Sequence, residues 1–220
     1  MGEGIRSAGL KRDEIFVTTK LWNDEQGSDS AQKACEQSLK RLKLDYVDLY
    51  LIHWPAPRKD LYVDSWKTMI RLKEQGLVRS IGVSNFTAEH LDRIIRETGV
   101  APVLNQIELH PRFQQRALRG AHADRNIITE SWSPLGQGQS LQDPVIGAIA
   151  AKHKRTPAQV IIRWHLDSGF VVIPKSVTPS RITENFDVFG FQLDADDMAK
   201  IAALDAKDGR IGPDPMTATF

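Results

Sequence analysis

Short runs of apolar, mostly β-branched residues alternate along the chain with longer segments in which apolar residues recur at helical spacing. The short runs predict strands at 15–20, 47–53, 78–84, 103–109, 127–133 and 171–175. The longer segments predict helices at about 29–43, 64–75, 87–97, 114–124, 144–153, 157–168 and 179–186. Strands that are apolar throughout and separated by helices are typical of a parallel sheet buried on both faces.

Residues with a preference for helix ends support these bounds. Candidate N-caps are Ser28 or Asp29, Thr87, and Thr156 with Pro157 at the first helical position. Glycines stand where helix C-termini belong, at Gly76, Gly99 and Gly169.

The ends of the strands distinguish a doubly wound sheet from a barrel. No Gly-x-Gly-x-x-Gly follows a predicted strand, so the usual dinucleotide-binding fingerprint is missing. Polar residues recur instead at the carboxyl ends of the strands, at Lys20, His53, Ser84-Asn85, Gln106, Glu108, His110, Trp132-Ser133 and Lys175-Ser176. In a (β/α)8 TIM barrel these ends surround one mouth, where active sites are built. The pattern therefore favours such a barrel, here with about six strand–helix units.

We expect residues 1–220 to form a single barrel domain, with 209–220 as a Gly/Pro-rich C-terminal tail. Residues 1–6 indicate the end of a helix before Gly9 with no strand in front of it, which predicts that further sequence precedes the chain. A closed barrel that loses two adjacent strands exposes two edges with unpaired N–H and C=O groups. Self-association through these edges, imperfect closure or low solubility is therefore expected.

Composition and charge narrow the class of function. The formal net charge is +1, and phosphate backbones or anionic membranes select a positive excess, so neither partner is expected. Cys35 is the single cysteine and lies in an amphipathic pattern, which indicates a small core residue and excludes an internal disulfide framework. The chain has no apolar leader and no apolar run of about 18 residues. A reducing cytoplasm is the expected location.

Six blocks of the sequence resemble aldo-keto reductases, in the order in which that family carries them. They are VTTKLW at 17–22, DLYLIHWP at 48–55, IGVSNF at 81–86, NQIELHP at 105–111, SPLG at 133–136 and IPKS at 173–176. The resemblance covers essentially all of the chain. The block ESWSPL at 130–135 is most similar to the prokaryotic 2,5-diketo-D-gluconate reductase-like branch.

The resemblance implies a catalytic set of Asp, Tyr, Lys and His, of which Lys20 and His53 match the last two. An ammonium beside the tyrosine lowers the pKa of its phenol and so assists proton donation to a carbonyl oxygen. By themselves, Lys20 would be a solvent contact and His53 a core histidine; their places in matching blocks reverse both interpretations. The family Asp and Tyr belong to a segment before Met1, so the activity of this chain is expected to be impaired.

The tyrosines of the chain offer little replacement for the missing acid. Tyr46 stands at the base of a strand, and Tyr50 has opposite parity to His53 and should face the helices. Tyr62 stands in a predicted loop from which it could approach the mouth.

The same resemblance implies an NADPH site. Ser84, Asn85 and Gln106 match contacts to the nicotinamide carboxamide, and Trp132 matches the aromatic residue that stacks on the nicotinamide ring, although alone it would be a core tryptophan. Ser133, Leu135 and Gly136 match the pyrophosphate loop. The stretch 175–185 matches the adenosine end through Lys175, Ser176, Val177, Thr178, Arg181, Glu184 and Asn185. Two cations, Lys175 and Arg181, favour a 2′-phosphate and hence NADPH over NADH.

Trp22, Trp54 and His110 are candidates for the substrate pocket, which would suit small carbonyl compounds. Glu108-x-His110 could place two metal ligands on one strand face, but no third is evident and Pro111 follows, so no metal site is expected. The prediction is an NADPH-dependent reductase of small aldehydes, ketones or diketones. The alternative is a non-catalytic NADP(H)-binding or scaffolding fragment.

Overall fold

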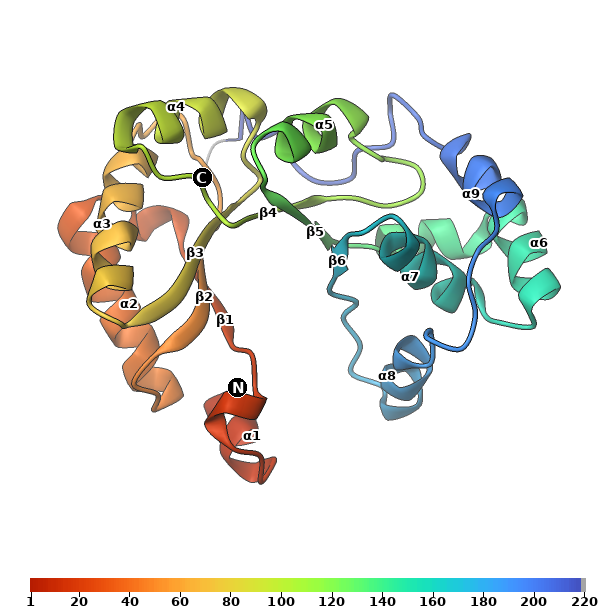
Figure 1. Ribbon diagram of the computed structural model, residues 1–220, viewed down its shortest axis with the longest axis horizontal. Helices are drawn as coiled ribbons and strands as arrows, with labels where there is room; N and C mark the ends of the chain where they lie inside the picture. Colours follow the sequence, from red (N-terminus) through yellow and green to blue (C-terminus); the bar gives the residue numbers. More distant parts are fainter. Residues whose placement is uncertain (219–220) are drawn as a thin grey trace. The chain divides into compact units, whose positions relative to one another are not determined.

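Strands and helices alternate in a computed structural model of the chain, which describes residues 1–218 (Figure 1). The chain divides into two compact units. The first contains Met1–Asn105, Asp124–Ile127 and the chain from Asp214 on, and the second contains Gln106–Ala123 and Ile128–Pro213. The last two residues of the expected C-terminal tail, 219 and 220, lie outside the described part of the chain.

The first unit is built on three parallel strands. In chain order its elements are α1 (Gly2–Ser7), η1 (Arg12–Glu14), β1 (Thr18–Leu21), η2 (Asn23–Glu25), α2 (Ser28–Leu42), β2 (Val47–Ile52), α3 (Tyr62–Glu74), β3 (Val78–Ser84), α4 (Ala88–Thr98) and the start of β4 (Leu104–Glu108). β2 lies between β1 and β3, with Lys20 opposite Leu51 and Leu51 opposite Gly82.

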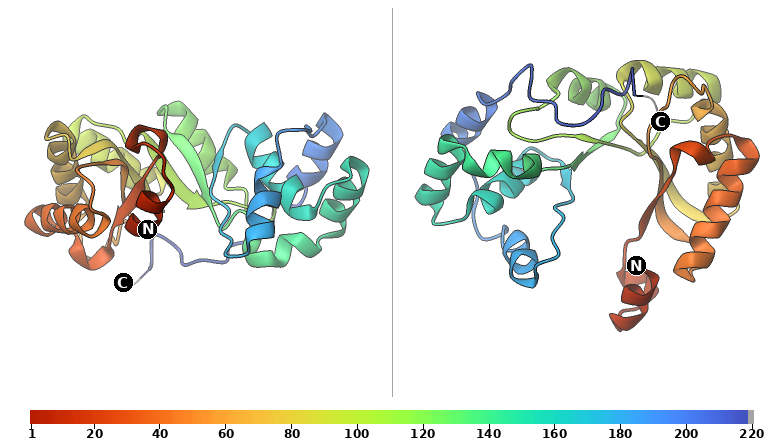
Figure 2. Two further views of the ribbon diagram at one scale, coloured as in Figure 1. Left: turned by 90° about the horizontal axis from the view of Figure 1, so that it is seen from below. Right: turned by 180° about the vertical axis from the view of Figure 1, so that it is seen from behind.

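Apolar side chains fill both faces of these strands. On one face α2 and α3 pack on the strands (Figure 2) and bury Tyr50 and Trp66 completely. The buried thiol of Cys35 lies in α2, and burial raises its pKa to about 11, as expected of a core residue. On the other face Leu51 belongs to a cluster with Leu104. Each large side chain buried in this way contributes about 1.5–3 kcal/mol to folding.

An ion cluster fixes the starting ends of the strands. The buried carboxylate of Asp48 accepts hydrogen bonds from the Arg12 guanidinium at 2.7 Å and from the backbone N–H of Val17 at 2.8 Å. Arg79 approaches the same carboxylate at 3.4 Å. The guanidinium carbons of Arg12 and Arg79 each lie 4.1 Å from the centre of the Tyr46 ring. This cluster joins residues next to or within all three strands at the end opposite His53, and it places Tyr46 at the strand base as predicted.

The second unit combines the rest of β4 with shorter strands and a helical core. Its elements are α5 (Arg116–Asp124), β5 (Ile128–Trp132), η3 (Gly136–Gln142), α6 (Pro144–His153), α7 (Pro157–Asp167), β6 (Val171–Val172), α8 (Pro179–Phe186) and α9 (Ala195–Ala202). β5 and β6 pair in parallel, with Glu130 opposite Val171. The core consists of Ile146, Ile149, Ala150, Val160, Ile161, Trp164, Leu193 and Ile201, from α6, α7, α9 and the segment before α9.

All seven helices predicted from periodicity are present, with bounds that agree to within two residues. Thr87 and Thr156 cap their helices as predicted, and Gly99 ends α4 with a φ of 71°. The predicted N-cap of α2, Ser28 or Asp29, was wrong, because α2 begins at Ser28 and its N-cap is Gly27.

Three details of the predicted elements were wrong. β1 begins at Thr18 instead of residue 15, because the Arg12 side chain already binds the carbonyl of Ile15. β6 ends at Val172, and Pro174, which has no N–H for a sheet hydrogen bond, lies in the predicted remainder. α9 was missed because a fully buried Asp197 interrupts its apolar face.

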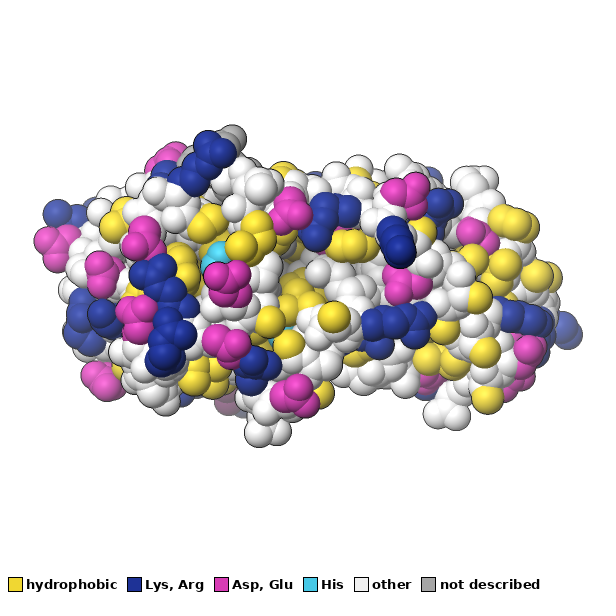
Figure 3. Space-filling model, turned by 90° about the horizontal axis from the view of Figure 1, so that it is seen from above, with side chains coloured by type: hydrophobic (Ala, Val, Ile, Leu, Met, Phe, Trp, Pro, Cys, Tyr) yellow, Lys and Arg dark blue, Asp and Glu magenta, His cyan; other side chains and the backbone are white. Residues whose placement is uncertain are grey.

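No helix in the described part of the chain is both long and apolar enough to span a membrane. Acidic and basic side chains are interspersed on the face drawn in Figure 3, in keeping with a formal net charge of +1.

Gly82→Ala should destabilise the protein. A Cβ at this position would lie 2.7 Å from the Leu104 carbonyl oxygen and 2.8 Å from Leu51 Cδ2, so the layer beneath Lys20 would have to move. We expect a cost of about 1–3 kcal/mol in urea unfolding. Gly120→Ala is the control, because its Cβ would meet nothing within 4 Å in helix α5 and should stabilise by roughly 0.5–1 kcal/mol. Equal stability of the two variants would contradict the assigned packing.

Candidate functional site

The carboxyl ends of β1, β2 and β3 bring several predicted site residues together in the first unit. The N–H of His53 donates to the carbonyl of Leu21 at 3.1 Å and so continues the pairing of β1 with β2. Lys20 lies opposite Leu51, two residues before His53, and side chains two residues apart share a strand face. Lys20 and His53 therefore project on the same side of the sheet.

His53 is held in an aromatic setting. Its ring centre lies 5.1 Å from that of Trp22 and 6.4 Å from that of Trp54. Trp54 is buried, whereas 53% of Trp22 is exposed, so one tryptophan supports the histidine and the other is available to a ligand. The Nδ1 atom of His53 is buried and has no hydrogen-bond partner within residues 1–218.

The block around Ser84 and Asn85 fixes the backbone of this strand end. The side-chain amide of Asn85 donates to the carbonyl oxygen of His53 at 3.0 Å and to Ser84 Oγ at 3.1 Å. Asn85 has a φ of 63°, in the left-handed region that asparagine adopts more readily than most residues. Ser84 and Asn85 are buried here, so they could present polar groups to a ligand only at the edge of the sheet.

Burial and, to a smaller extent, the positive charge of Lys20 together lower the pKa of His53 from 6.5 to about 4. The ring is therefore neutral at neutral pH. A neutral imidazole has one N–H donor and one acceptor nitrogen, so His53 can hydrogen-bond a carbonyl oxygen without carrying a charge into the site.

The three tyrosines are used in packing. Tyr50 faces α2, because it interacts electrostatically with Cys35 and Arg41 of that helix. Burial raises the pKa of its phenol. The predicted orientation of Tyr50 is therefore confirmed. The expectation that Tyr62 stands in a loop was wrong, because it is the first residue of α3 and packs edge-on against Phe86.

In the second unit, Gln106 is tied to a buried acid. Its side-chain amide donates to the carboxylate of Glu130 on β5, and both residues are buried. This contact fixes the orientation of the Gln106 side chain against β5. Glu130 is a charged residue within an otherwise apolar strand. That pattern could have indicated a role, but no role was predicted for Glu130.

The segment after β5 turns sharply. Trp132 ends β5, and Ser133 and Gly136 have φ angles of 50° and 57°. The Gly136 N–H donates to the Ser133 carbonyl at 2.8 Å, which closes the turn. The side chain of Leu135 packs against the core between α6 and α7, so Leu135 could contact a ligand only through its backbone.

Glu108 and His110 form a buried pair. The ring Nε2 of His110 lies 3.2 Å from Glu108 Oε1, and both side chains are 2% exposed. The Glu108 carboxylate also accepts the backbone N–H groups of Ile211 and Gly212, at 2.6 and 2.8 Å. His110 is thus buried within the second unit, and Glu108 binds the C-terminal tail.

Part of the stretch predicted for the adenosine end lines a pocket of about 350 Å³ between the segment after β6 and α8. Its lining includes Lys175, Ser176 and Asn185, together with Pro174, Ile182 and Phe186. Val177 is 85% exposed, and Thr178 precedes the first turn of α8.

The other predicted residues of this stretch lie outside the pocket lining. Arg181, on the first turn of α8, is exposed. Within residues 1–218, neither Arg181 nor Lys175 forms an ion pair. The carboxylate of Glu184 accepts a hydrogen bond from the Thr156 hydroxyl at 2.6 Å, and this bond links α8 to the N-terminus of α7.

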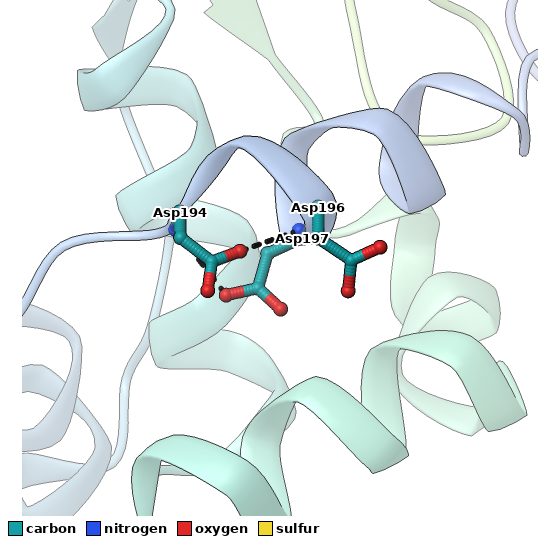
Figure 4. Close-up of side chains that lie close together, drawn as sticks. All are labelled: Asp194, Asp196 and Asp197. Atoms are coloured by element: carbon teal, nitrogen blue, oxygen red, sulfur yellow. Dashed lines mark hydrogen bonds between the residues drawn. The ribbon is translucent and has the colours of Figure 1, made fainter.

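A cluster of Asp194, Asp196 and Asp197 was not predicted (Figure 4). Lys152 donates to Asp194 at 2.6 Å and to Asp197 at 2.8 Å, and His153 reaches Asp197 at 2.7 Å. These contacts attach α6 to the start of α9. They account for the cluster as an ion-paired joint between two helices.

Comparison with known proteins places the chain in a family. The aldo/keto reductase family model matches residues 1–206. The methylglyoxal reductase DkgA of Escherichia coli K12 is 56% identical over 217 residues, which are 98% of this chain and 78% of that protein. An aldo-keto reductase of Mycolicibacterium smegmatis is 54% identical over 219 residues, covering 100% of this chain and 79% of the relative.

Solved structures agree. The apo form of Gox0644 is 61% identical, with a TM-score of 0.96 over 100% of this chain and 79% of that one. A mutant of the same protein, crystallised in complex with NADPH, gives the same values. The chain belongs to the aldo/keto reductase family, a family of oxidoreductases. The predicted (β/α)8 fold class and the likeness to the diketogluconate-reductase-like branch are confirmed by these matches.

Imidazole NMR titration should place the pKa of His53 at about 4 in the native protein. The folded pKa lies below the ordinary 6.5, so the neutral ring contributes stability at neutral pH that is lost as pH falls from about 6.5 to about 4. Lys20→Met removes a charge and should raise the pKa, whereas Lys20→Arg keeps the charge and should leave it low. A native His53 that titrates near 6.5 would show that the ring is solvated.

Proposed function

We propose that this protein reduces small aldehydes, ketones or diketones to alcohols with NADPH. The observation that carries the proposal is the pocket beside α8, where Lys175 and Ser176 line a cavity of about 350 Å³ and Arg181 stands on the first turn of the helix. A pocket edged by cations suits a 2′-phosphate, which accepts charge-assisted hydrogen bonds from both types of side chain. Family membership and the NADPH complex of Gox0644 support the same cofactor.

The residues of the second unit fit the cofactor. At the adenosine end, the apolar side chains of Ile182 and Phe186 border the pocket and offer a surface for a purine base. Gln106 and Trp132, of the same unit, would hold the nicotinamide amide and ring. When bound, NADPH would supply the hydride for the carbonyl carbon.

His53 and Lys20 are proposed to act on the carbonyl oxygen. Neutral His53 donates its N–H to that oxygen and orients the substrate between Trp22 and the sheet edge. The positive charge of Lys20 stabilises the negative charge that develops on the oxygen as hydride adds to the carbon, and a proton from water then completes the alcohol. The half-exposed ring of Trp22 covers an apolar substituent, which favours short carbonyl compounds such as methylglyoxal.

Two measurements test the proposal. Fluorescence titration reports NADPH binding, and loss of NADPH absorbance with methylglyoxal reports reduction. Binding with turnover supports the proposal. Absence of NADPH binding, or binding without reduction of any small carbonyl compound, contradicts it.

Replacing either Lys175 of the pocket lining or Arg181 on the adjoining turn of α8 should weaken NADPH binding selectively. Arg181→Ala and Lys175→Ala each remove a charge-assisted hydrogen bond to the 2′-phosphate, so the Kd for NADPH should rise about 10- to 100-fold. NADH has no 2′-phosphate and should bind the variants as it binds the parent protein. Lys33→Ala, on the exposed side of α2, is the control and should change neither Kd. Equal losses for NADH and NADPH would contradict the assigned phosphate contact.

A further inference from the structure

A buried carboxylate binds the start of the C-terminal tail. Glu108 accepts the successive N–H groups of Ile211 and Gly212, which lie 103 and 104 residues further along the chain. His110 supplies a third contact from the same strand end. All of these residues belong to the second unit, so the anchor is an internal feature of that unit.

The anchor is charged at neutral pH. Burial raises the pKa of Glu108, but the hydrogen bonds from His110 and from the N–H groups of Ile211 and Gly212 outweigh burial, and the net shift is downward. The tail is therefore bound by an ionised carboxylate, which accepts stronger hydrogen bonds than a neutral group does.

The anchored tail lies directly on Trp132. A Cβ added to Gly212 would come within 2.5 Å of Cη2 and 3.3 Å of Cζ2 of the indole, and within 2.9 Å of Glu108 Oε2. The backbone at Gly212 thus contacts the six-membered ring of Trp132 where no side chain would fit. Gly209 makes a similarly close approach to the carbonyl of Arg112, and Arg210 stacks 4.7 Å above the Phe113 ring. Contacts on either side of Ile211 thus hold the tail in this path.

We propose that Glu108 is a positioning residue, which through the tail 209–213 fixes the indole of Trp132 in the orientation needed to stack on the nicotinamide ring. The inference rests on the proposed function, because it assumes that Trp132 contacts the cofactor. It adds that the backbone of Gly212 packs against the indole of Trp132, and that the carboxylate of Glu108 binds this backbone.

This role predicts an effect on one end of the cofactor only. Gly212 contacts Trp132, and Glu108 binds the backbone of Gly212. The adenosine pocket is lined by other residues, within 174–186. Loosening the tail should therefore weaken the nicotinamide contact and leave the adenosine contact unchanged. Adenosine 2′,5′-bisphosphate carries the adenine and the 2′-phosphate but no nicotinamide, so it reports on the adenosine pocket alone.

Two variants of the full chain test the inference by different routes. Glu108→Gln keeps the volume but turns an amide NH2 toward donors that need an acceptor, and Gly212→Ala pushes the tail off the indole while leaving the carboxylate in place. In both, the Kd for NADPH should rise about fivefold or more, the scale of one lost ring contact. The Kd for adenosine 2′,5′-bisphosphate should stay within about twofold of the parent value. Gly147→Ala is the control, because its Cβ in α6 would meet nothing within 4 Å.

Several outcomes would overturn the inference, and they are distinguishable from failure of the proposed function. If the parent protein binds NADPH and both variants bind it equally well, the tail does not position Trp132. If both ligands weaken together, Glu108 and Gly212 support the second unit as a whole. If the parent protein binds neither ligand, the proposed function fails, and the inference fails with it.

Discussion

In a parallel sheet that is buried on both faces, polar side chains can reach solvent or a ligand only at the ends of the strands. At the starting ends of β1–β3 this constraint is met by Asp48, whose carboxylate is saturated by arginine and backbone N–H donors. At the carboxyl ends, the buried Nδ1 atom of His53 has no hydrogen-bond partner among residues 1–218. A buried polar atom without a partner is costly, so this is a place where a ligand would gain a hydrogen bond.

The depressed pKa of His53 follows from the same constraint. Burial beside apolar strands and the nearby charge of Lys20 both disfavour the imidazolium form. A neutral ring between two tryptophans can offer a hydrogen bond without repelling Lys20. A neutral His53 can therefore lie near Lys20 without the charge repulsion that a protonated histidine would add.

Local patterns were sufficient for the helices, because caps and periodicity are properties of neighbouring residues. They failed where a distant residue decides the outcome. Asp197 interrupts the apolar face of α9 because Lys152 and His153 stabilise it from α6. The roles of Glu130 and Glu108 were equally hidden, since their partners lie 24 and more than 100 residues away. The candidate site could be predicted from motif blocks, but the contacts that hold its members in place could not.

The contacts of Asn85 give a physical explanation for the motif block at 81–86. Asn85 follows a strand at a left-handed φ, a conformation that leaves its side chain close to the preceding backbone. Its amide then reaches the carbonyl of His53 on the neighbouring strand and the hydroxyl of Ser84. The backbone of His53 is thereby held from both sides, by Leu21 of β1 and by Asn85 after β3. Two blocks that look independent in the sequence are one hydrogen-bonded unit, and exchanging Asn85 for a residue without an amide would release the strand end that carries the histidine.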